Sequence, residues 1–342
     1  MPKLACAIGL LTAYCSTHAH TFCITNAAQL QDALTQSSAG GLYDAEDNTL
    51  HLVHGLYQTG AATGNAPFFY TSPNSMHFFG IAGGYADGCN APTRQTPRTR
   101  LDGGGHTGVL ALRSAQGAVD VRGLTLQNGD GAQPGTGLQV NYLVSANAAV
   151  AIQDVVVRNN HSSGNAGGVF VTAGGGTLWF VNNQITGNSA DGNYGGGLIT
   201  GNGTDSEVYN NTVARNTTVA VSGAVGGLYC GGTASCNVHG GIFWNNTGAG
   251  LYLGGDGTLR YNDYGVLGGQ APGTSEGNVS VNPQFVDADN GDFHLAGNSP
   301  LLGTSPYYSY AIDLDGNPPT ESGRIDLGAY EETIFVDGVD ED

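Results

Sequence analysis

The sequence predicts an all-β fold, a right-handed parallel β-helix (a solenoid) that begins with a capping helix. Two sets of residues recur along the chain with nearly the same period: a four-residue Gly-Leu-x-x-like signature, and an aliphatic residue followed three positions later by Asn. Within each unit apolar residues alternate with period two, as in Leu178-x-Phe180, and helical three-four spacing is absent. The repeat unit is therefore built from strands and turns.

Each recurring set has a structural reason in a stack of coils. Coils of a parallel β-helix lie roughly 4.8 Å apart, so equivalent residues form columns along the axis. An Asn at the same turn of successive coils can pass amide hydrogen bonds up the stack, and Gly permits positive φ at another turn. The signatures are GLQV (Gly137–Val140), GVFV (Gly168–Val171), GLIT (Gly197–Thr200), GLYC (Gly227–Cys230) and GLYL (Gly250–Leu253). The second set is Leu126, Val157, Ile185, Val213 and Ile242, with Asn160, Asn188, Asn216 and Asn245 after the last four.

The chain starts with a segment typical of export. Residues 1–19 combine Lys3, an apolar stretch and the small-residue site Thr17-His18-Ala19, which predicts a cleaved signal peptide. Its removal leaves Cys23, Cys89, Cys230 and Cys236, an even number in an oxidising compartment, so we expect two disulfides. Three pairings are open, and proximity in sequence favours Cys23 with Cys89 and Cys230 with Cys236.

The remaining chain divides into four parts. Residues 20–100 are expected to form an N-terminal cap and irregular strands, with a helix over Asn26 to Ser38 that Thr25 or Asn26 caps. Residues 101–285 hold the coils, and residues 286–332 a C-terminal block. Residues 333–342 form an acidic tail.

Composition excludes several classes of function. The formal net charge is −18, with 10 Lys and Arg against 28 Asp and Glu, so a nucleic-acid partner is excluded. Lys3 is the single lysine, and the mature chain therefore lacks a Schiff-base lysine and a P-loop lysine. No transmembrane segment is predicted, because no other apolar stretch is long enough to span a bilayer.

The motifs of the chain resemble one known family. They are the Leu101-Asp-Gly-Gly-Gly105 run, the Asn and Gly-Gly coils, Asn282-Pro-Gln-Phe-Val286, Gly297-Asn-Ser-Pro300, Asp313-Leu-Asp-Gly316 and Arg324-Ile-Asp-Leu-Gly-Ala-Tyr-Glu331. Together they resemble the choice-of-anchor Q family, right-handed β-helix proteins of the pectate-lyase-like superfamily. The resemblance implies a bacterial protein that is secreted or held at the cell surface, and it implies no catalytic residues.

An enzyme is the first alternative that the superfamily suggests. A polysaccharide lyase needs carboxylates that hold Ca²⁺ against a uronate, and an arginine or lysine base. Asp120 and Glu207 share a column but lie three coils apart, so they do not form such a cluster. Arg158 is the weak candidate for a base, and Asp313 and Asp315 are weak candidates for a Ca²⁺ site. No other cofactor is predicted.

Two outward surfaces favour binding instead. The first is a stripe formed by the third residue of each signature: Gln139, Phe170, Ile199, Tyr229 and Tyr252. The second is a group on adjacent strands: Trp179, Tyr209, Asp154, Asn182, Asn210, Gln184, Arg158 and His239. Aromatic rings and short amides suit the faces and hydroxyls of sugars. The alternative is that another segment covers the stripe and that the second group is an ordinary polar β-face.

We therefore expect an exported, non-catalytic protein that binds a polysaccharide or an envelope glycan, or has a structural role. A lyase or hydrolase with a site built from loops is one alternative, and an adhesin-like module that binds protein is the other. The sequence does not determine the oligomeric state.

Overall fold

The structure is a computed structural model. It describes residues 19–60, 63–73, 76–92, 99–114, 116–142, 149–306, 312–318 and 323–332. The first eighteen residues of the expected signal peptide and the whole expected acidic tail, residues 333–342, lie outside the described residues.

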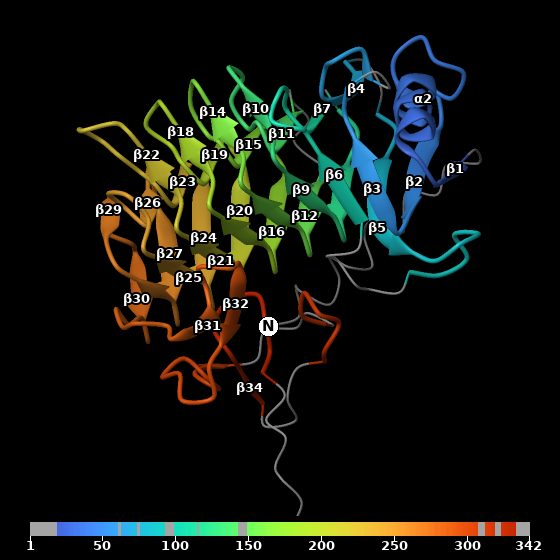
Figure 1. The fold of residues 1–342 in the computed structure, drawn as a ribbon. Helices are drawn as coiled ribbons and strands as arrows, with labels where there is room; N and C mark the ends of the chain where they lie inside the picture. The colour runs from blue at the N-terminus through green and yellow to red at the C-terminus, as the bar shows by residue number, and fades with distance from the viewer. Residues whose placement is uncertain are drawn as a thin grey trace, which may run out of the picture.

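The chain winds into stacked coils whose strands form three long parallel sheets and one short one (Figure 1). Sheet A contains β1 (Ala19–Ile24), β2 (Asp47–Val53), β5 (Phe79–Tyr85), β8 (Val119–Arg122), β12 (Ala149–Gln153), β16 (Thr177–Val181), β20 (Asp205–Tyr209), β24 (Ser235–His239), β27 (Gly257–Arg260) and β30 (Thr274–Glu276). Sheet B contains β3 (Gly55–Gln58), β6 (Thr99–Asp102), β9 (Thr125–Gln127), β13 (Val156–Arg158), β17 (Gln184–Thr186), β21 (Thr212–Ala214), β25 (Ile242–Trp244) and β28 (Asp263–Tyr264). Sheet C contains β4 (Phe68–Ser72), β7 (Leu110–Ser114), β11 (Leu138–Tyr142), β15 (Val169–Ala173), β19 (Gly197–Gly201), β23 (Leu228–Gly231), β26 (Leu251–Leu253) and β29 (Leu267–Gly269). Sheet D contains β10 (Asp130–Gly131), β14 (His161–Ser162), β18 (Ser189–Ala190) and β22 (Thr217–Thr218).

The parallel β-helix and its capping helix are confirmed. Helix α2 spans Ala27–Ser37, and the side chain of Asn26 accepts a hydrogen bond from the backbone N–H of Gln29, as an N-cap does. The helix buries Leu30, Ala33 and Leu34 against the first coil, so the N-terminal end of the core is closed.

The coils begin well before residue 101. β1 pairs with β2, β2 with β5, and β5 with β8 in sheet A, while β3 pairs with β6 in sheet B and β4 with β7 in sheet C, all in parallel. The strands expected to be irregular are therefore full members of the three long sheets. Their coils carry neither the Gly-Leu signature nor the Asn column, which is why the sequence pattern does not mark them. The last strand of sheet A is β30, and the coils end near residue 280 rather than at 285.

The core is a stack of aliphatic columns. The expected register is wrong at two positions, Ile242 and Asn245. Leu126, Val157, Ile185 and Val213 point inward as predicted, but Val213 pairs with Phe243, while Ile242 pairs with Thr212 and faces outward. The spacing in this coil is 30 residues instead of 29, and the same shift moves the Asn column from Asn245 to Asn246.

The predicted asparagine ladder is present. The Nδ2 atoms of Asn160, Asn188 and Asn216 each donate to the Oδ1 atom of the next asparagine at 3.0 Å, and Asn246 is the last member. A second ladder, which the sequence analysis missed, joins Asn183 to Asn211 at another turn. Each amide is satisfied by its neighbours, so these asparagines are structural.

The turn between sheets A and B has the same left-handed backbone in every coil from β8 onwards. Its residues are Gly123, Asp154, Asn182, Asn210, Gly240, Tyr261 and Gly277, with φ between 51° and 65°. Gly, Asn and Asp are the residue types that tolerate this conformation, and Tyr261 is the exception. Asp154, Asn182 and Asn210 are therefore explained by backbone geometry.

After the last coil the chain folds back along the outside of sheet B. This C-terminal segment, residues 281–332 as far as they are described, contains two short antiparallel pairs and lies beneath the coils in Figure 1. The pairs are β31 (Phe285–Asp287) with β32 (Asp292–Leu295), and β33 (Ser305–Pro306) with β34 (Arg324–Ile325).

Three consecutive residues fix this segment to three consecutive coils. The N–H of Gly328 donates to the carbonyl of Gly240, the N–H of Ala329 to Thr212 Oγ1, and Tyr330 Oη to Gln184 Oε1. The segment thus runs across the strands rather than along them. Its apolar side chains cover the outward residues Val156, Ala214 and Ile242 of sheet B with Phe293, Leu295, Leu301, Leu314 and Leu327.

Both expected disulfides are present, Cys23–Cys89 at the N-terminal end and Cys230–Cys236 between sheets C and A. Within the described residues, no helix is both long and apolar enough to cross a membrane.

We predict that Asn188→Ala lowers the free energy of unfolding by about 2–4 kcal/mol. The side chain of Asn188 is fully buried and takes part in four hydrogen bonds, with Asn160, Val157 and Asn216, and its loss leaves buried partners unsatisfied. Urea unfolding followed by circular dichroism measures the change. Asn193→Ala, at an exposed asparagine, is the matched control and should change stability by no more than about 0.5 kcal/mol. Equal losses in the two variants would contradict the ladder's role.

Candidate functional site

The predicted aromatic stripe lies on the outer face of sheet C, but Leu198 takes the place that was predicted for Ile199. Phe170, Leu198, Tyr229 and Tyr252 occupy neighbouring positions of β15, β19, β23 and β26 and are half-buried. Ile199 points inward and is 1% exposed, because Gly197 pairs with Val169 and the signature in β19 is therefore shifted by one residue. Gln139 shares the column but is buried, with Nε2 donating to the carbonyl of Pro134.

The rings of this stripe contact one another. Tyr229 stacks on Tyr252 with centroids 4.9 Å apart, and Tyr194 meets Tyr229 edge to face at 5.1 Å. On the other side of Tyr252 lies Gly268, whose backbone packs against the ring. Both faces of the Tyr252 ring therefore contact protein, and Tyr252 covers one face of Tyr229.

Two aromatic rings on the outer face of sheet A are arranged differently from those of the stripe. Trp179 on β16 and Tyr209 on β20 are half-buried, and their centroids are 6.4 Å apart with planes 69° apart, so the two rings do not stack on each other. The strand before Trp179 places the small side chain of Ala151 beside it. The described part of the C-terminal segment packs on sheet B and at the turn between sheets A and B, rather than on this face.

Polar groups on the next strands complete a sheet A surface, which we define as Trp179, Tyr209, Glu207, Asn237 and Thr258. Tyr209 Oη donates to Glu207 Oε2, Asn237 Nδ2 donates to Glu207 Oε1 at 3.1 Å, and Thr258 Oγ1 donates to Asn237 Oδ1 at 2.9 Å. These bonds hold the side chains in fixed positions beside the two rings. Glu207, Asn237 and Thr258 were not among the predicted site residues; register in sheet A identifies them.

His239 belongs to the same strands but not to the exposed surface. It is buried next to Tyr209, whose ring lies 5.0 Å away, and burial together with the charge of Arg260 lowers the pKa of His239 to about 4. It is therefore neutral at pH 7 and contributes packing rather than charge.

Three further predicted residues lie in the turn described above. Asn182 and Asn210 are fully buried, so neither can contact a ligand. Asn182 Nδ2 donates to Asp154 Oδ1 at 2.7 Å and to the carbonyl of Ile312, which belongs to the C-terminal segment. Burial raises the pKa of Asp154 to about 6.

The last two predicted residues, Gln184 and Arg158, lie on sheet B beneath the C-terminal segment. Gln184 is buried and accepts the hydrogen bond of Tyr330. Arg158 donates twice to Gln127 Oε1, from Nε at 3.1 Å and Nη2 at 2.8 Å, and no ion pair joins it to a carboxylate of the described residues. Among the described residues, the arrangement that a lyase needs, an arginine base beside carboxylates that hold Ca²⁺, is therefore not found at Arg158.

An arginine with acidic neighbours does occur at another position. Arg122 on β8 forms an ion pair with Asp120, and the charge of Asp154 also acts on it. Burial raises the pKa of Asp120, whose Oδ1 atom has no hydrogen-bond partner. Sequence columns missed this cluster because Asp154 lies in the turn and not in a strand. As predicted, Asp120 and Glu207 share a column with Ala151 and Trp179 between them.

The carboxylate of Asp313 has a structural role in the C-terminal segment. It accepts from the N–H groups of Asp315, Asn317 and Glu331 and from Asn317 Nδ2, so its oxygens organise a turn of the C-terminal segment. Asp315 Oδ2 instead lies 2.7 Å from His294 Nε2. Among the described residues there is no group of three or more His, Cys, Asp or Glu side chains that could hold a metal ion.

His294 joins two parts of the C-terminal segment. Its Nδ1 atom lies 2.6 Å from Asp292, its Nε2 atom contacts Asp315, and its ring lies 4.1 Å from that of Tyr330. The hydrogen bond with Asp315 is the main cause that raises the pKa of His294 to about 9, and Asp292 adds to it. The imidazolium is therefore the stable form at neutral pH.

Comparison with known proteins adds no assignment to these surfaces. No protein-family model matches the sequence, and no curated protein matches it either.

We predict that the attachment of the C-terminal segment weakens in alkali. A group whose pKa is raised on folding stabilises the protein fully below its unfolded pKa, near 6.5, and this stabilisation is lost as the pH rises through about 9. Limited proteolysis at pH 7 and pH 10 should show faster cleavage within the segment at pH 10. His294→Gln should remove most of this difference, whereas His106→Gln, at an exposed histidine, should keep it. Equal pH dependence in all three proteins would contradict the prediction.

Proposed function

We propose that this protein is a non-catalytic carbohydrate-binding protein that acts outside the cytoplasm, and that the sheet A surface holds the glycan. The observation that carries the proposal is the pair Trp179 and Tyr209, whose half-buried rings lie on the outer face of a parallel sheet without stacking on each other. Apolar sugar faces pack on such rings, while neighbouring amide, carboxylate and hydroxyl groups bond to sugar hydroxyls.

The position of the polar groups supports the same proposal. Glu207, Asn237 and Thr258 are already held by hydrogen bonds to one another and to Tyr209, so little side-chain entropy is lost when a ligand binds. The surface extends over four consecutive strands, β16 to β27, which suits several sugar units of a polymer rather than one small molecule.

Export is supported by separate observations. Two disulfides are typical of proteins in oxidising compartments, and residues 1–19 have the pattern of a signal peptide. The resemblance to the choice-of-anchor Q family points in the same direction, towards a secreted or surface-held bacterial protein.

The absence of catalysis is part of the proposal and has its own support. The candidate base Arg158 is engaged by Gln127, and the candidate Ca²⁺ ligand Asp313 uses its oxygens for four N–H donors. Arg122 and Asp120 are the groups to substitute first if cleavage is observed.

We predict that fluorescence will detect binding at Trp179. The chain has two tryptophans, so Trp244→Phe leaves Trp179 as the single reporter. Titration with a panel of neutral and uronate-containing polysaccharides, with and without Ca²⁺, should shift its emission to shorter wavelength for at least one polymer, because the ring leaves water. Chain length and unsaturated product are followed in the same samples and should not change.

Variants then locate the site. Trp179→Ala should weaken retention on the bound polymer by about tenfold or more, the factor that corresponds to about 1.4 kcal/mol of lost aromatic contact. Tyr252→Ala, on sheet C, should leave it unchanged. Loss of binding only in Tyr252→Ala would move the site to the aromatic stripe, and cleavage of any polymer would overturn the non-catalytic proposal. Failure of every polymer to bind would favour a structural role.

A further inference from the structure

The hydrogen bonds of the sheet A surface have a fixed direction. Its residues Trp179, Glu207, Asn237 and Thr258 pair in register on β16, β20, β24 and β27, so they form one column along the outer face. A carboxylate only accepts hydrogen bonds. The amide of Asn237 therefore turns its Nδ2 atom to Glu207 and its Oδ1 atom to Thr258, and the hydroxyl of Thr258 donates to Asn237.

This direction leaves the surface rich in hydrogen-bond acceptors. Tyr209 gives its one hydroxyl proton to Glu207, and Thr258 gives its one hydroxyl proton to Asn237. Glu207 accepts one bond at each oxygen among the described residues, whereas a carboxylate has about four acceptor positions. A ligand that brings donor groups to this surface therefore forms more hydrogen bonds than a ligand that brings acceptors.

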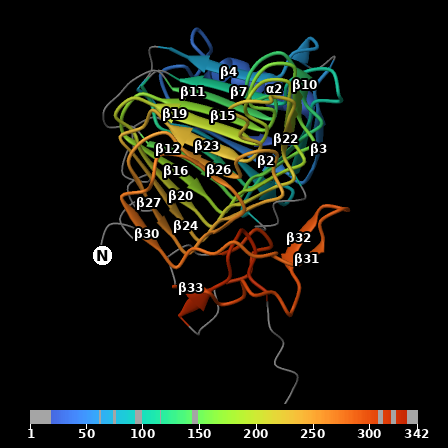
Figure 2. The same ribbon diagram turned by 90° about the vertical axis from the view of Figure 1, so that its left-hand side faces the viewer.

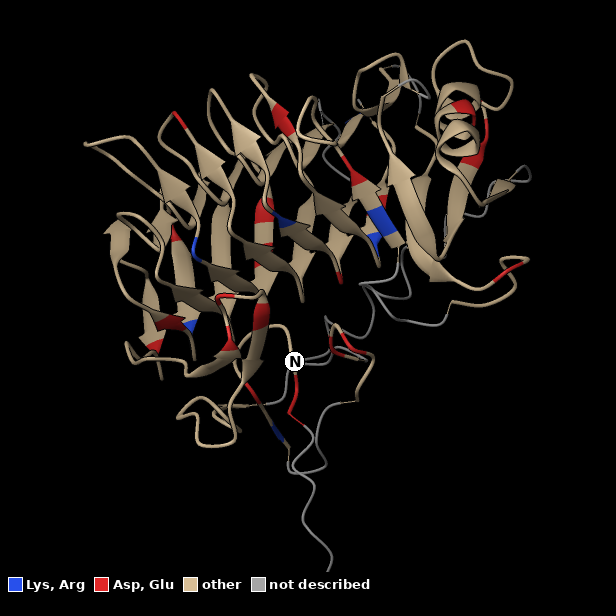
Figure 3. Ribbon diagram, in the orientation of Figure 1, with Lys and Arg blue, Asp and Glu red and all other residues tan. Residues whose placement is uncertain are grey.

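The charge of the same strands is negative. β16 and β24 contain no Asp, Glu, Lys or Arg, and β20 contains Asp205 and Glu207 (Figure 3). On β27 the base Arg260 is paired with Glu276 at the border of the surface. Burial and the charge of Arg260 lower the pKa of His239 to about 4, so this ring adds no positive charge at pH 7. The surface therefore favours a cationic group over an anionic one.

The aromatic rings add to this preference. Trp179 and Glu207 are direct neighbours on paired strands, which lie roughly 4.8 Å apart, and the faces of tryptophan and tyrosine rings attract cations. A cation at Glu207 can therefore contact a ring and a carboxylate together. Figure 2 shows β16, β20, β24 and β27 side by side along one side of the solenoid, so a polymer can follow the column over several sugar units.

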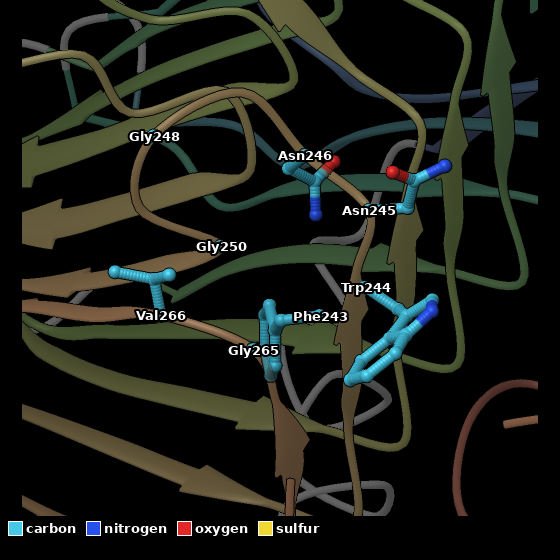
Figure 4. A pocket seen from close by; sticks show the side chains of 8 residues that line it. All are labelled: Phe243, Trp244, Asn245, Asn246, Gly248, Gly250, Gly265 and Val266. Atoms are coloured by element: carbon cyan, nitrogen blue, oxygen red, sulfur yellow. The ribbon is translucent and has the colours of Figure 1, made fainter. Parts of the chain in front are cut away.

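The second tryptophan of the chain has different surroundings. Trp244 lines a shallow cleft of about 230 Å³ together with Asn245, Asn246 and Val266 (Figure 4). None of the residues that line this cleft is charged, and Asn246 Oδ1 already accepts two hydrogen bonds from Asn216. A cationic group finds no opposite charge there, so the sheet A surface is the better place for it.

We propose that the glycan held by the sheet A surface carries free amino groups, which makes it an amino-sugar polymer that is at least partly free of N-acetylation. One ammonium group lies against Trp179 and donates to Glu207, and hydroxyl groups of neighbouring sugars donate to the remaining acceptors. Uronates are disfavoured because they bring negative charge and acceptors. This inference rests on the proposed carbohydrate site and adds the chemical class of its ligand.

Three oligosaccharides of equal length test the proposal: oligomers of glucosamine, of N-acetylglucosamine and of galacturonate. The reporter is the emission of Trp179 in Trp244→Phe, at about pH 6, where amines are protonated. The glucosamine oligomer should bind about tenfold more tightly than the acetylated one, because acetylation removes the charge and the charged donor. The difference should largely disappear near 1 M salt, where the Debye length is about 3 Å.

Glu207→Gln removes the charge and keeps the size of the side chain. It should weaken binding of the glucosamine oligomer by about tenfold and change binding of the acetylated oligomer by no more than about twofold. Glu46→Gln is the matched control, because it makes the same change of net charge at a half-buried glutamate immediately before β2. It should leave both affinities unchanged, and circular dichroism checks that both variants fold.

The outcomes separate this inference from the proposed function. Equal binding of the glucosamine and acetylated oligomers, or tightest binding of the galacturonate oligomer, overturns the amino-sugar proposal while the carbohydrate site stands. A preference for glucosamine that Glu207→Gln leaves intact also overturns it. Oligo-ornithine of the same length is titrated in parallel, and equally tight binding of this peptide overturns the assignment of a glycan. Failure of every oligosaccharide to bind overturns both proposals.

Discussion

The spacing of parallel strands governs this molecule. Because every coil repeats at the distance between hydrogen-bonded strands, a residue suited to one turn is suited to the equivalent turn of the next coil. Asn160, Asn188 and Asn216 satisfy one another for this reason, and the left-handed turn between sheets A and B repeats for the same reason. The fold therefore selects short amides and glycines at the turns and leaves functional variation to the outward faces of the strands.

Sequence reasoning succeeded where this repeat is regular. The solenoid, the capping helix, the asparagine ladder and both disulfides follow from spacing and residue type. The predicted orientation is wrong by one residue at Ile199 and at Ile242. The coil of Ile199 contains an additional glycine and the coil of Ile242 an additional residue, and either insertion exchanges inward-facing for outward-facing positions. Sequence reasoning also missed the coils before residue 101, where apolar strands form the same sheets without the turn residues that mark the later coils.

The candidate site was only partly predictable because it depends on contacts between distant segments. Trp179 and Tyr209 were placed on one face by strand alternation alone. Gln184 and Arg158 could not be separated from them by sequence, because nothing local shows that the described part of the C-terminal segment folds back over sheet B. The same packing buries Asn182 and engages Gln184, so an apparently continuous polar surface is divided between an open sheet and a covered one.

The course of Gly328, Ala329 and Tyr330 has a mechanical consequence. These residues bind three successive coils in the C-terminal half of the solenoid, those of β17, β21 and β25, and they lie just before the point where the described chain ends at residue 332. A tether attached beyond that point would hold the rod side-on, with sheet B towards the anchor. Tension would load the three bonds together in shear, whereas tension on an end coil would peel the strands apart one at a time.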